Sequence, residues 1–122
     1  MINLDTARQH LQDKIDLQAT EWMALHQKAA VDAKAIIAMI AERYQPNRIY
    51  QWGSLLKPDL FRDYSDIDIA VEGLRHPADL LHLLRDAEAL TGFPLDIVEL
   101  DHLEVVHADT IRQKGKCVYE RQ

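Results

Sequence analysis

The first third of the sequence is one uninterrupted helical pattern, which leaves only the remainder of the chain to build a sheet. Apolar residues recur at steps of three and four between residues 4 and 44, and neither Gly nor Pro occurs there. The recurring positions are Leu4, Ala7, Leu11, Ile15, Trp22, Leu25, Ala29, Ala33, Ile36, Ile40 and Tyr44, with Gln18 as the polar exception. We therefore expect one amphipathic helix, or two nearly collinear helices with a break near residue 20.

This helix is too long for a small domain to cover. An unbroken helix over residues 4–44 would measure about 60 Å at about 1.5 Å per residue, roughly twice the width of such a domain. Its C-terminal half can cover a sheet, but the N-terminal apolar stripe would lie in water. The stripe consists of Leu4, Leu11, Ile15, Trp22 and Leu25. We expect this half to pack against a second copy of the chain or a partner protein, or to fold back at the break.

The rest of the chain alternates short apolar segments with turn signals, which predicts a small mixed sheet flanked by helices. Pro46 and Asn47 end the long helical pattern, because proline cannot continue a helix. Strands are expected at residues 48–52, 67–71, 94–100 and 116–119. Helices are expected at residues 54–57 (one turn), 77–90 and 103–113. We expect a single α/β (α+β) domain, with a helical segment over residues 1–45 and a core over residues 46–122.

Composition excludes several classes of protein. The chain has 122 residues, of which 48% are hydrophobic, so it can bury one core. Its 20 acidic and 14 basic residues give a formal net charge of −6 without a basic cluster, which argues against binding of duplex nucleic acid. One cysteine permits neither an internal disulfide nor a multi-cysteine zinc site. Because no secretory signal or long apolar segment occurs, we expect a cytoplasmic protein outside the membrane.

Three carboxylates occur on predicted strands, where apolar residues would be usual. Asp66 and Asp68 open the strand at 67–71 and share one face of it, because side chains alternate along a strand. If the strand carrying Asp96 lies next to it, the third carboxylate reaches the same place. Like charges so close repel one another unless a cation lies between them. All-oxygen ligands suit a hard ion such as Mg²⁺.

The pair Gly53-Ser54, at the end of the strand at 48–52, can supply a site for phosphate. A glycine there lets a ligand approach the backbone closely, and Ser54 as the N-cap of a short helical turn would favour an anion. By itself the pair is weak evidence, since Gly and Ser are common in turns. The order is more informative: a strand, Gly-Ser, an eleven-residue connection (55–65), Asp-x-Asp opening the next strand, and a later Asp.

Each of these acidic residues also has a plain structural interpretation. Asp66 could cap a turn, Asp68 could pair with Arg62 or Arg48, and Asp96 could lie on the solvent face of an edge strand. None of these roles requires a ligand. Taken together with the Gly-Ser pair, however, the order of the motifs favours a common site.

The stretch GSLLKPDLFRDYSDIDI at residues 53–69 resembles the signature of the DNA polymerase beta type nucleotidyltransferase superfamily, in particular of the minimal nucleotidyltransferases. The resemblance covers roughly residues 33–119 and implies that superfamily's fold. It implies nucleotide phosphate contacts at Gly53, Ser54 and Ser65, two Mg²⁺ ions held by Asp66 and Asp68, and Asp96 at the ion on the acceptor side. Two departures are a connection one residue longer and Leu55 where many members have Arg, so Lys57 or Arg62 is expected to contact the triphosphate.

The resemblance also implies a reaction and a partner. In such proteins an acceptor hydroxyl attacks the α-phosphorus of a nucleoside triphosphate, here expected to be ATP, without a dedicated protein base. Minimal nucleotidyltransferases are commonly encoded beside a HEPN-domain toxin, which they neutralise by binding or by transferring AMP to a tyrosine. We therefore expect the antitoxin of such a pair. The alternatives are a non-catalytic binding antitoxin with a vestigial metal site, and an antibiotic nucleotidyltransferase completed by dimerisation.

Overall fold

Helix α1 (Leu4–Arg43) confirms the long helical pattern and runs through residue 20 without a break. In the computed structural model, which describes residues 3–122, the Asn3 side chain caps the helix by accepting hydrogen bonds from the backbone N–H groups of Asp5 and Thr6. Gln45, with φ of 47°, and Pro46 then turn the chain into the sheet. The alternative in which the helix breaks near residue 20 and its N-terminal half folds back is therefore wrong.

The sheet is mixed, as expected, and its four strands lie close to the predicted positions. The strands are β1 (Arg48–Trp52), β2 (Ile67–Glu72), β3 (Leu95–Glu99) and β4 (Lys116–Glu120), in the order β3-β2-β1-β4. Strand β1 is antiparallel to both β2 and β4, while β2 and β3 run parallel. The parallel pair needs a crossover connection, which helix α2 (Asp79–Glu88) provides. Strands β3 and β4 are the edges.

The shorter helices differ from expectation at their ends. Helix α2 is shorter than the predicted 77–90, because a turn closed by the Asp79 N–H and the His76 carbonyl precedes it. Helix α3 (Val105–Lys114) begins two residues later than predicted, after a short 3-10 helix, η3 (Leu100–His102). The connection after β1 contains two further 3-10 helices, η1 (Gly53–Leu56) and η2 (Pro58–Leu60). These ends are set by local hydrogen bonds that an apolar pattern does not record.

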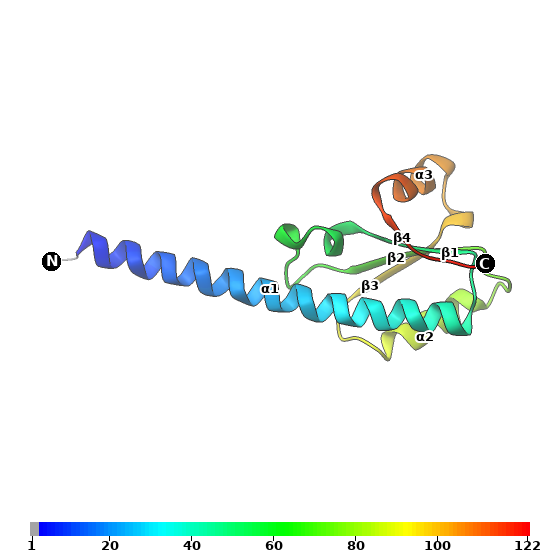
Figure 1. Ribbon diagram of the computed structural model, residues 1–122, viewed down its shortest axis with the longest axis horizontal. Helices are drawn as coiled ribbons and strands as arrows, with labels where there is room; N and C mark the ends of the chain where they lie inside the picture. Colours follow the sequence, from blue (N-terminus) through cyan, green and yellow to red (C-terminus); the bar gives the residue numbers. More distant parts are fainter. Residues whose placement is uncertain (1–2) are drawn as a thin grey trace.

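The two faces of the sheet have different covers. Helices α1 and α2 lie on one face and α3 on the other (Figure 1). Side chains toward α1 and α2 include Ile49, Ile67, Ile69, Val71 and Ile97. Side chains packed with α3 include Tyr50, Trp52, Ala70 and Val98. Because neighbours on a strand alternate, Asp68, between Ile67 and Ile69, points to the α3 face.

Helix α1 is buried only in its C-terminal half. Ala29, Ile36 and Ile40 are each 0% exposed in the core. In contrast, every described residue up to Glu21 is exposed, and the N-terminal part of the helix projects well beyond the sheet (Figure 1). None of the helices in the described part of the chain is both long and apolar enough to cross a membrane.

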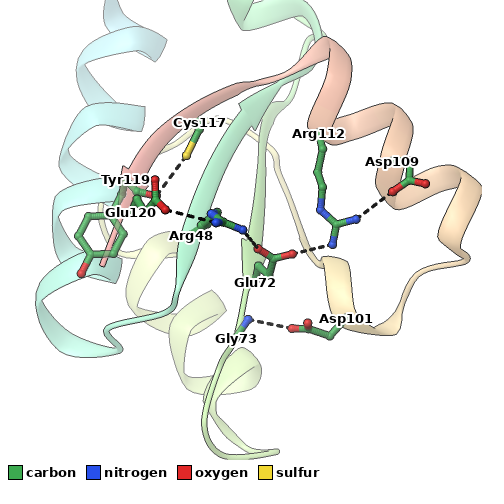
Figure 2. A network of polar contacts seen from close by, with 9 residues as sticks. All are labelled: Arg48, Glu72, Gly73, Asp101, Asp109, Arg112, Cys117, Tyr119 and Glu120. Carbon is green, nitrogen blue, oxygen red and sulfur yellow. Dashed lines mark hydrogen bonds and ion pairs between the residues drawn. The ribbon is translucent and has the colours of Figure 1, made fainter. Parts of the chain in front are cut away.

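A network of ion pairs holds α3 and β4 to the sheet (Figure 2). Arg48 pairs with Glu72 and Glu120, each at 3.3 Å, which ties β1 to its two neighbours. Arg112 of α3 pairs with Glu72 at 2.6 Å and with Asp109 at 3.1 Å. Arg48 is therefore engaged here, and the structural interpretation in which it pairs with Asp68 is wrong.

Candidate active site

Asp68 and Asp96 lie opposite each other on neighbouring strands. Strands β2 and β3 are in register at Asp68 and Asp96, so the two side chains lie on the same face of the sheet. Asp66 comes two residues before Asp68, immediately ahead of β2. Strand β3 is an edge strand, as the structural interpretation of Asp96 assumed, but Asp96 is half-buried there. The strand carrying the third carboxylate therefore lies where the metal-site hypothesis needs it.

The electrostatics of Asp68 reflect this crowding. Burial raises the pKa of Asp68 to about 7, and the negative charges of Asp96 and Asp66 add to the effect. One carboxylate on the adjacent strand, Asp96, and one just before the same strand, Asp66, thus act on Asp68. A cation bound there would favour the ionised form of Asp68, because it would offset both the desolvation and the repulsion.

A glycine is required at position 53 for two reasons: the conformation of its backbone and the closeness of the Asp68 side chain. Its φ is +80°, a left-handed conformation that residues with a side chain rarely adopt. A Cβ at this position would collide with the Asp68 carboxylate, lying 2.8 Å from its Cγ. The register supports this proximity, because Trp52, directly before Gly53, pairs with Asp68. The Gly-Ser turn is therefore in contact with Asp68, although an eleven-residue connection separates Ser54 from Asp66.

Ser54 lies inside the turn rather than at its cap, which corrects the sequence prediction. The 3-10 helix η1 begins at Gly53, the residue at its cap position is Trp52, and no side chain caps it. The Ser54 carbonyl accepts the N–H of Lys57 at 2.9 Å. A single 3-10 turn offers little of a helix dipole, so Ser54 can contribute to an anion site only through its own groups.

Arg62 and Ser65 hold in place the connection between the Gly-Ser turn and Asp66. The Ser65 hydroxyl accepts the Arg62 N–H at 2.9 Å, and the Ser65 N–H donates to the Arg62 carbonyl at 3.0 Å. The Arg62 guanidinium stacks 3.9 Å from the centroid of the Trp22 ring and donates to the carbonyls of Asp59 and Phe61. The structure therefore places Arg62 against α1, where it is not paired with Asp68.

His26 is a site-supporting residue that the sequence analysis did not identify. Its Nε2 lies 2.8 Å from the Leu55 carbonyl oxygen, which can only accept, so Nε2 carries the hydrogen. The ring also meets Phe61 edge to face at 5.5 Å between centroids. The available signal was its spacing, four residues after Trp22 at the border of the apolar stripe, which brings both side chains to the same connection.

A cleft of about 260 Å³ opens beside the Gly-Ser turn, between η1 and α3. It is lined by Trp52, Gly53, Leu56, Lys57, His107, Thr110, Ile111 and Lys114. Of the two basic residues predicted to reach a triphosphate, Lys57 lines this cleft and Arg62 does not. Within residues 3–122, the Trp52 indole N–H is the buried side-chain polar group without a hydrogen-bond partner.

The acidic residues fit Mg²⁺ in their chemistry. Carboxylate oxygens are its preferred ligands, and it commonly takes only one or two of them together with water and substrate phosphate. Asp68 and Asp96 supply such a pair. In the described part of the chain, no group of three or more His, Cys, Asp or Glu side chains is arranged to hold a metal ion. A site with all three carboxylates as direct ligands thus stays a prediction.

Comparison with known proteins agrees with this architecture. The family described as "Polymerase beta, Nucleotidyltransferase" matches residues 34–122. A chain in the crystal structure of the toxin-antitoxin MntA-HepT is similar, with 21% identity and a TM-score of 0.56 over 76% of this chain and 74% of that chain. A toxin-antitoxin crystal structure with AMP-PNP contains a chain with 24% identity and a TM-score of 0.58, over 72% and 73% of the two chains.

A mutant of the MntA-HpeT toxin-antitoxin is a third similar structure, with 22% identity and a TM-score of 0.60 over 74% of each chain. At these identities the structural likenesses establish the fold. None of the curated proteins compared with the sequence matches it.

Proposed function

The chain belongs to the polymerase beta nucleotidyltransferase family, and on that premise we propose that it is the Mg²⁺-dependent antitoxin of a HEPN toxin. It transfers AMP from ATP to a hydroxyl group of the toxin. The resemblance of this chain's motifs to minimal nucleotidyltransferases implies that the hydroxyl belongs to a tyrosine. The observation that carries this proposal is the contact of Gly53 with the Asp68 carboxylate, with Asp96 beside it. A phosphate turn and acidic metal ligands must meet for this chemistry.

The residues have separate roles in the proposed site. Asp66, Asp68 and Asp96 would hold Mg²⁺, which offsets the charge that develops on the phosphate during transfer. Gly53 lets the nucleotide phosphates approach the backbone, and Ser54 and Lys57 offer them donors. Ser65, which the resemblance assigned to phosphate, and Arg62, which was expected at the triphosphate because Leu55 replaces the family's Arg, are given a supporting role. Their polar groups order the connection between η1 and β2.

The transfer is a displacement at the α-phosphorus. The acceptor oxygen forms a bond to that phosphorus, the bond between the α-phosphorus and the bridging oxygen breaks, and pyrophosphate leaves. The hydroxyl proton passes to solvent. Acceptor and leaving group lie on opposite sides of the phosphorus, so the site needs access from both sides.

The toxin is proposed to dock along the free half of α1. Leu4, Leu11 and Ile15 are 71%, 60% and 51% exposed, and they continue the stripe that packs in the core further along the helix. In Figure 1 this half projects from the side of the molecule where residues 53–60 (green) lie. A protein bound along it would therefore lie near the candidate site. The similar structures are toxin-antitoxin complexes, which supports a protein partner.

A labelling experiment tests the proposal. The chain, the product of the adjacent gene and ATP labelled at the α-phosphate are incubated with Mg²⁺, and covalent label on the neighbour's product is measured. We expect labelling that EDTA stops and that Asp68→Asn reduces by at least about 100-fold, because a ligand needed in the transition state is lost. Asp59→Asn, at an exposed position of η2, is the matched control and should label normally.

The second candidate function is a binding-only antitoxin. The exposed stripe of α1 favours it, since a docking helix can neutralise a toxin without chemistry. Neutralisation of the toxin by Asp68→Asn as well as by wild type, without label on either, would establish this candidate and exclude the first. Labelling of an aminoglycoside in place of the protein would instead point to an antibiotic nucleotidyltransferase.

A further inference from the structure

Asp32 is a buried carboxylate in the row of α1 residues that packs in the core. Its exposed fraction is 6%, and Ala29 and Ile36, on the same side of the helix, are each 0% exposed. One carboxylate oxygen accepts a hydrogen bond from the Thr91 hydroxyl at 2.7 Å, and the other accepts one from the Lys28 ammonium group at 3.1 Å. The hydrogen bond from Thr91 holds the pKa of Asp32 below its ordinary value, so the carboxylate is charged at neutral pH. Packing alone does not require this charge, because an apolar side chain of similar size would avoid the cost of desolvation.

Thr91 joins Asp32 to the segment that leads into β3. Its hydroxyl donates to Asp32 and accepts the N–H of Phe93 at 3.1 Å, so one group links α1 to the backbone of that segment. Residues 91–94 belong to neither a helix nor a strand. At the end of the segment, the Pro94 carbonyl accepts the N–H of Ile67 at 2.9 Å, directly before the paired residues of β2 and β3. The bond from Thr91 to Asp32 therefore holds the place where β3 begins to pair.

The apolar pattern of β3 does not by itself fix its register against β2. Phe93, Leu95 and Ile97 are apolar at steps of two residues, so a slip of two residues would still turn apolar side chains toward α1 and α2. Such a slip would move Asp96 about 7 Å along β2, away from Asp68, at about 3.3 Å per residue. Because β3 is an edge strand, β2 is its one partner in the sheet of the described chain. An anchor directly before β3 distinguishes these registers.

A second contact joins the segments that lead to the carboxylates. Phe93 meets Phe61 edge to face, with 6.0 Å between the ring centroids. Phe61 is 0% exposed and lies in the connection that leads to Asp66. Because the Thr91 hydroxyl binds the Phe93 N–H, the same anchor sets where the segment before Asp96 meets the segment before Asp66.

We propose that Asp32 is a positioning residue of the candidate site: by binding Thr91, it fixes the register in which β3 presents Asp96 opposite Asp68. Asp32 belongs to α1, which covers the other face of the sheet, so it acts on the site through the backbone (Figure 1). The proposal rests on the proposed function, in which these aspartates hold Mg²⁺, and extends it to residues outside the motifs that carry the resemblance. Mg²⁺ demands near-ideal ligand geometry, so a displaced Asp96 would bind it weakly.

Binding of Mn²⁺, which stands in for Mg²⁺, tests this role without the transfer reaction. The dissociation constant of Mn²⁺ alone is measured on the purified chain by electron paramagnetic resonance, and amide hydrogen exchange at Ile67 is followed by NMR. We expect Thr91→Val, which keeps the shape and loses the hydroxyl, to weaken Mn²⁺ binding about 5- to 20-fold and to speed exchange at Ile67 about fivefold. Asp32→Leu should have the same effects. Thr91→Ser retains the hydroxyl, so both measurements should stay within about twofold of wild type.

The matched control is Ile36→Val, which removes a buried methyl group one turn further along α1 without changing Asp32 or Thr91. It should lower the stability of the protein and leave the Mn²⁺ affinity within about twofold of wild type. Unchanged Mn²⁺ affinity in Thr91→Val and Asp32→Leu, with both variants folded as wild type by circular dichroism, would overturn the positioning role. An equal loss of affinity in Ile36→Val, or no rescue by Thr91→Ser, would overturn it too.

Failure of the proposed function gives a different result. If the wild type binds no Mn²⁺, the metal site of the proposed function is refuted. Exchange at Ile67 then decides the role of Asp32, since faster exchange in Thr91→Val and Asp32→Leu supports it and unchanged exchange overturns it. If both variants selectively lose Mn²⁺ binding while the wild type labels no toxin, the positioning role is supported and the transfer reaction is refuted.

Discussion

At the scale of single residues, Asp68 is the group on which the candidate site depends. It faces Asp96 across the parallel strands and fills the space that the missing Cβ of Gly53 leaves. Its side chain is taken partly out of water beside other carboxylates, an arrangement that costs stability unless something binds there. A purely structural aspartate would gain nothing from these surroundings, since no basic side chain among residues 3–122 forms an ion pair with it.

Asp68 should make the metal-free protein less stable as the pH rises. Its pKa of about 7 in the folded state lies above the ordinary value of 3.8, so the folded state holds the proton longer than the unfolded state. The free energy of unfolding therefore falls between about pH 4 and pH 7, and the loss is complete above pH 7. In urea unfolding at pH 8, we expect Asp68→Asn to gain about 1 to 2 kcal/mol over wild type, after allowing for solvent screening.

The same comparison at pH 4 supplies the internal reference, because Asp68 is protonated in the folded wild type there and most of the pH-dependent loss of stability has not yet occurred. Addition of Mg²⁺ at pH 8 should stabilise the wild type and leave Asp68→Asn unchanged. Equal stability of the two proteins at both pH values would show that Asp68 is not in the crowded environment described above.

At the scale of elements, α1 supports the connection between η1 and β2 as well as the core. Trp22 and His26 both contact residues between the Gly-Ser turn and Asp66: Trp22 stacks with Arg62, and His26 donates to the Leu55 carbonyl. Further along the helix, the buried Asp32 accepts a hydrogen bond from the Thr91 hydroxyl at 2.7 Å. The helix thus fixes two connections, one before β2 and one before β3.

Loss of the His26 hydrogen bond should loosen the Gly-Ser turn. His26→Ala leaves the Leu55 carbonyl without its donor, and a hydrogen bond of about 1 kcal/mol corresponds to roughly fivefold faster local opening. Amide hydrogen exchange over residues 55–65 measures this, and we expect the KM for ATP to rise in parallel. His26→Gln, which keeps an N–H donor, should restore most of the protection.

His10→Ala is the control for this experiment, because His10 lies on the exposed half of the same helix. If the amide exchange rates of residues 55–65 are the same in His26→Ala and His10→Ala, the contact of His26 with the Leu55 carbonyl has no positioning role.

At the scale of the whole molecule, the chain combines a packed domain with a helix that extends past it (Figure 1). Leu4, Leu11 and Ile15 make no core contacts, and burying a side chain of this kind contributes about 1.5 to 3 kcal/mol. That energy is available to a complex after the cost of association is subtracted. The stripe is therefore the surface that the proposed antitoxin function would use for binding a partner.

Two charges in the stripe should abolish the complex without unfolding the domain. Leu11→Glu together with Ile15→Glu places carboxylates in the proposed interface, and light scattering after size exclusion with the toxin should show separate proteins. Thr6→Glu with Thr20→Glu is the matched control. Each threonine lies five residues from one of the two changed positions and nine from the other, which places it on the opposite side of the helix. A complex that survives the stripe changes would refute docking there, and a wild type that dimerises alone through the stripe would assign it to a second copy.

The sequence alone was sufficient for the long helix, for the positions of the strands and for the order of the motifs. The 40-residue helix α1, strand β1 and the alternation that puts Asp66 and Asp68 on one face all follow from local periodicity, because burial imposes periods of 3.6 and 2 on the chain. Gly-Ser and Asp-x-Asp are also local signals. A resemblance carried by those residues therefore identified the family before any contact was known.

Only the tertiary structure decided which distant residues meet. Segments far apart in the chain are joined by the register of Asp68 with Asp96, the stacking of Arg62 on Trp22 and the hydrogen bond from His26 to Leu55. Such contacts depend on how helices and strands pack together, which periodicity within one segment does not record. The sequence thus identified the Gly-Ser and acidic motifs, while only packing determined that Arg62 lies against Trp22 and that Asp68 lies against Gly53.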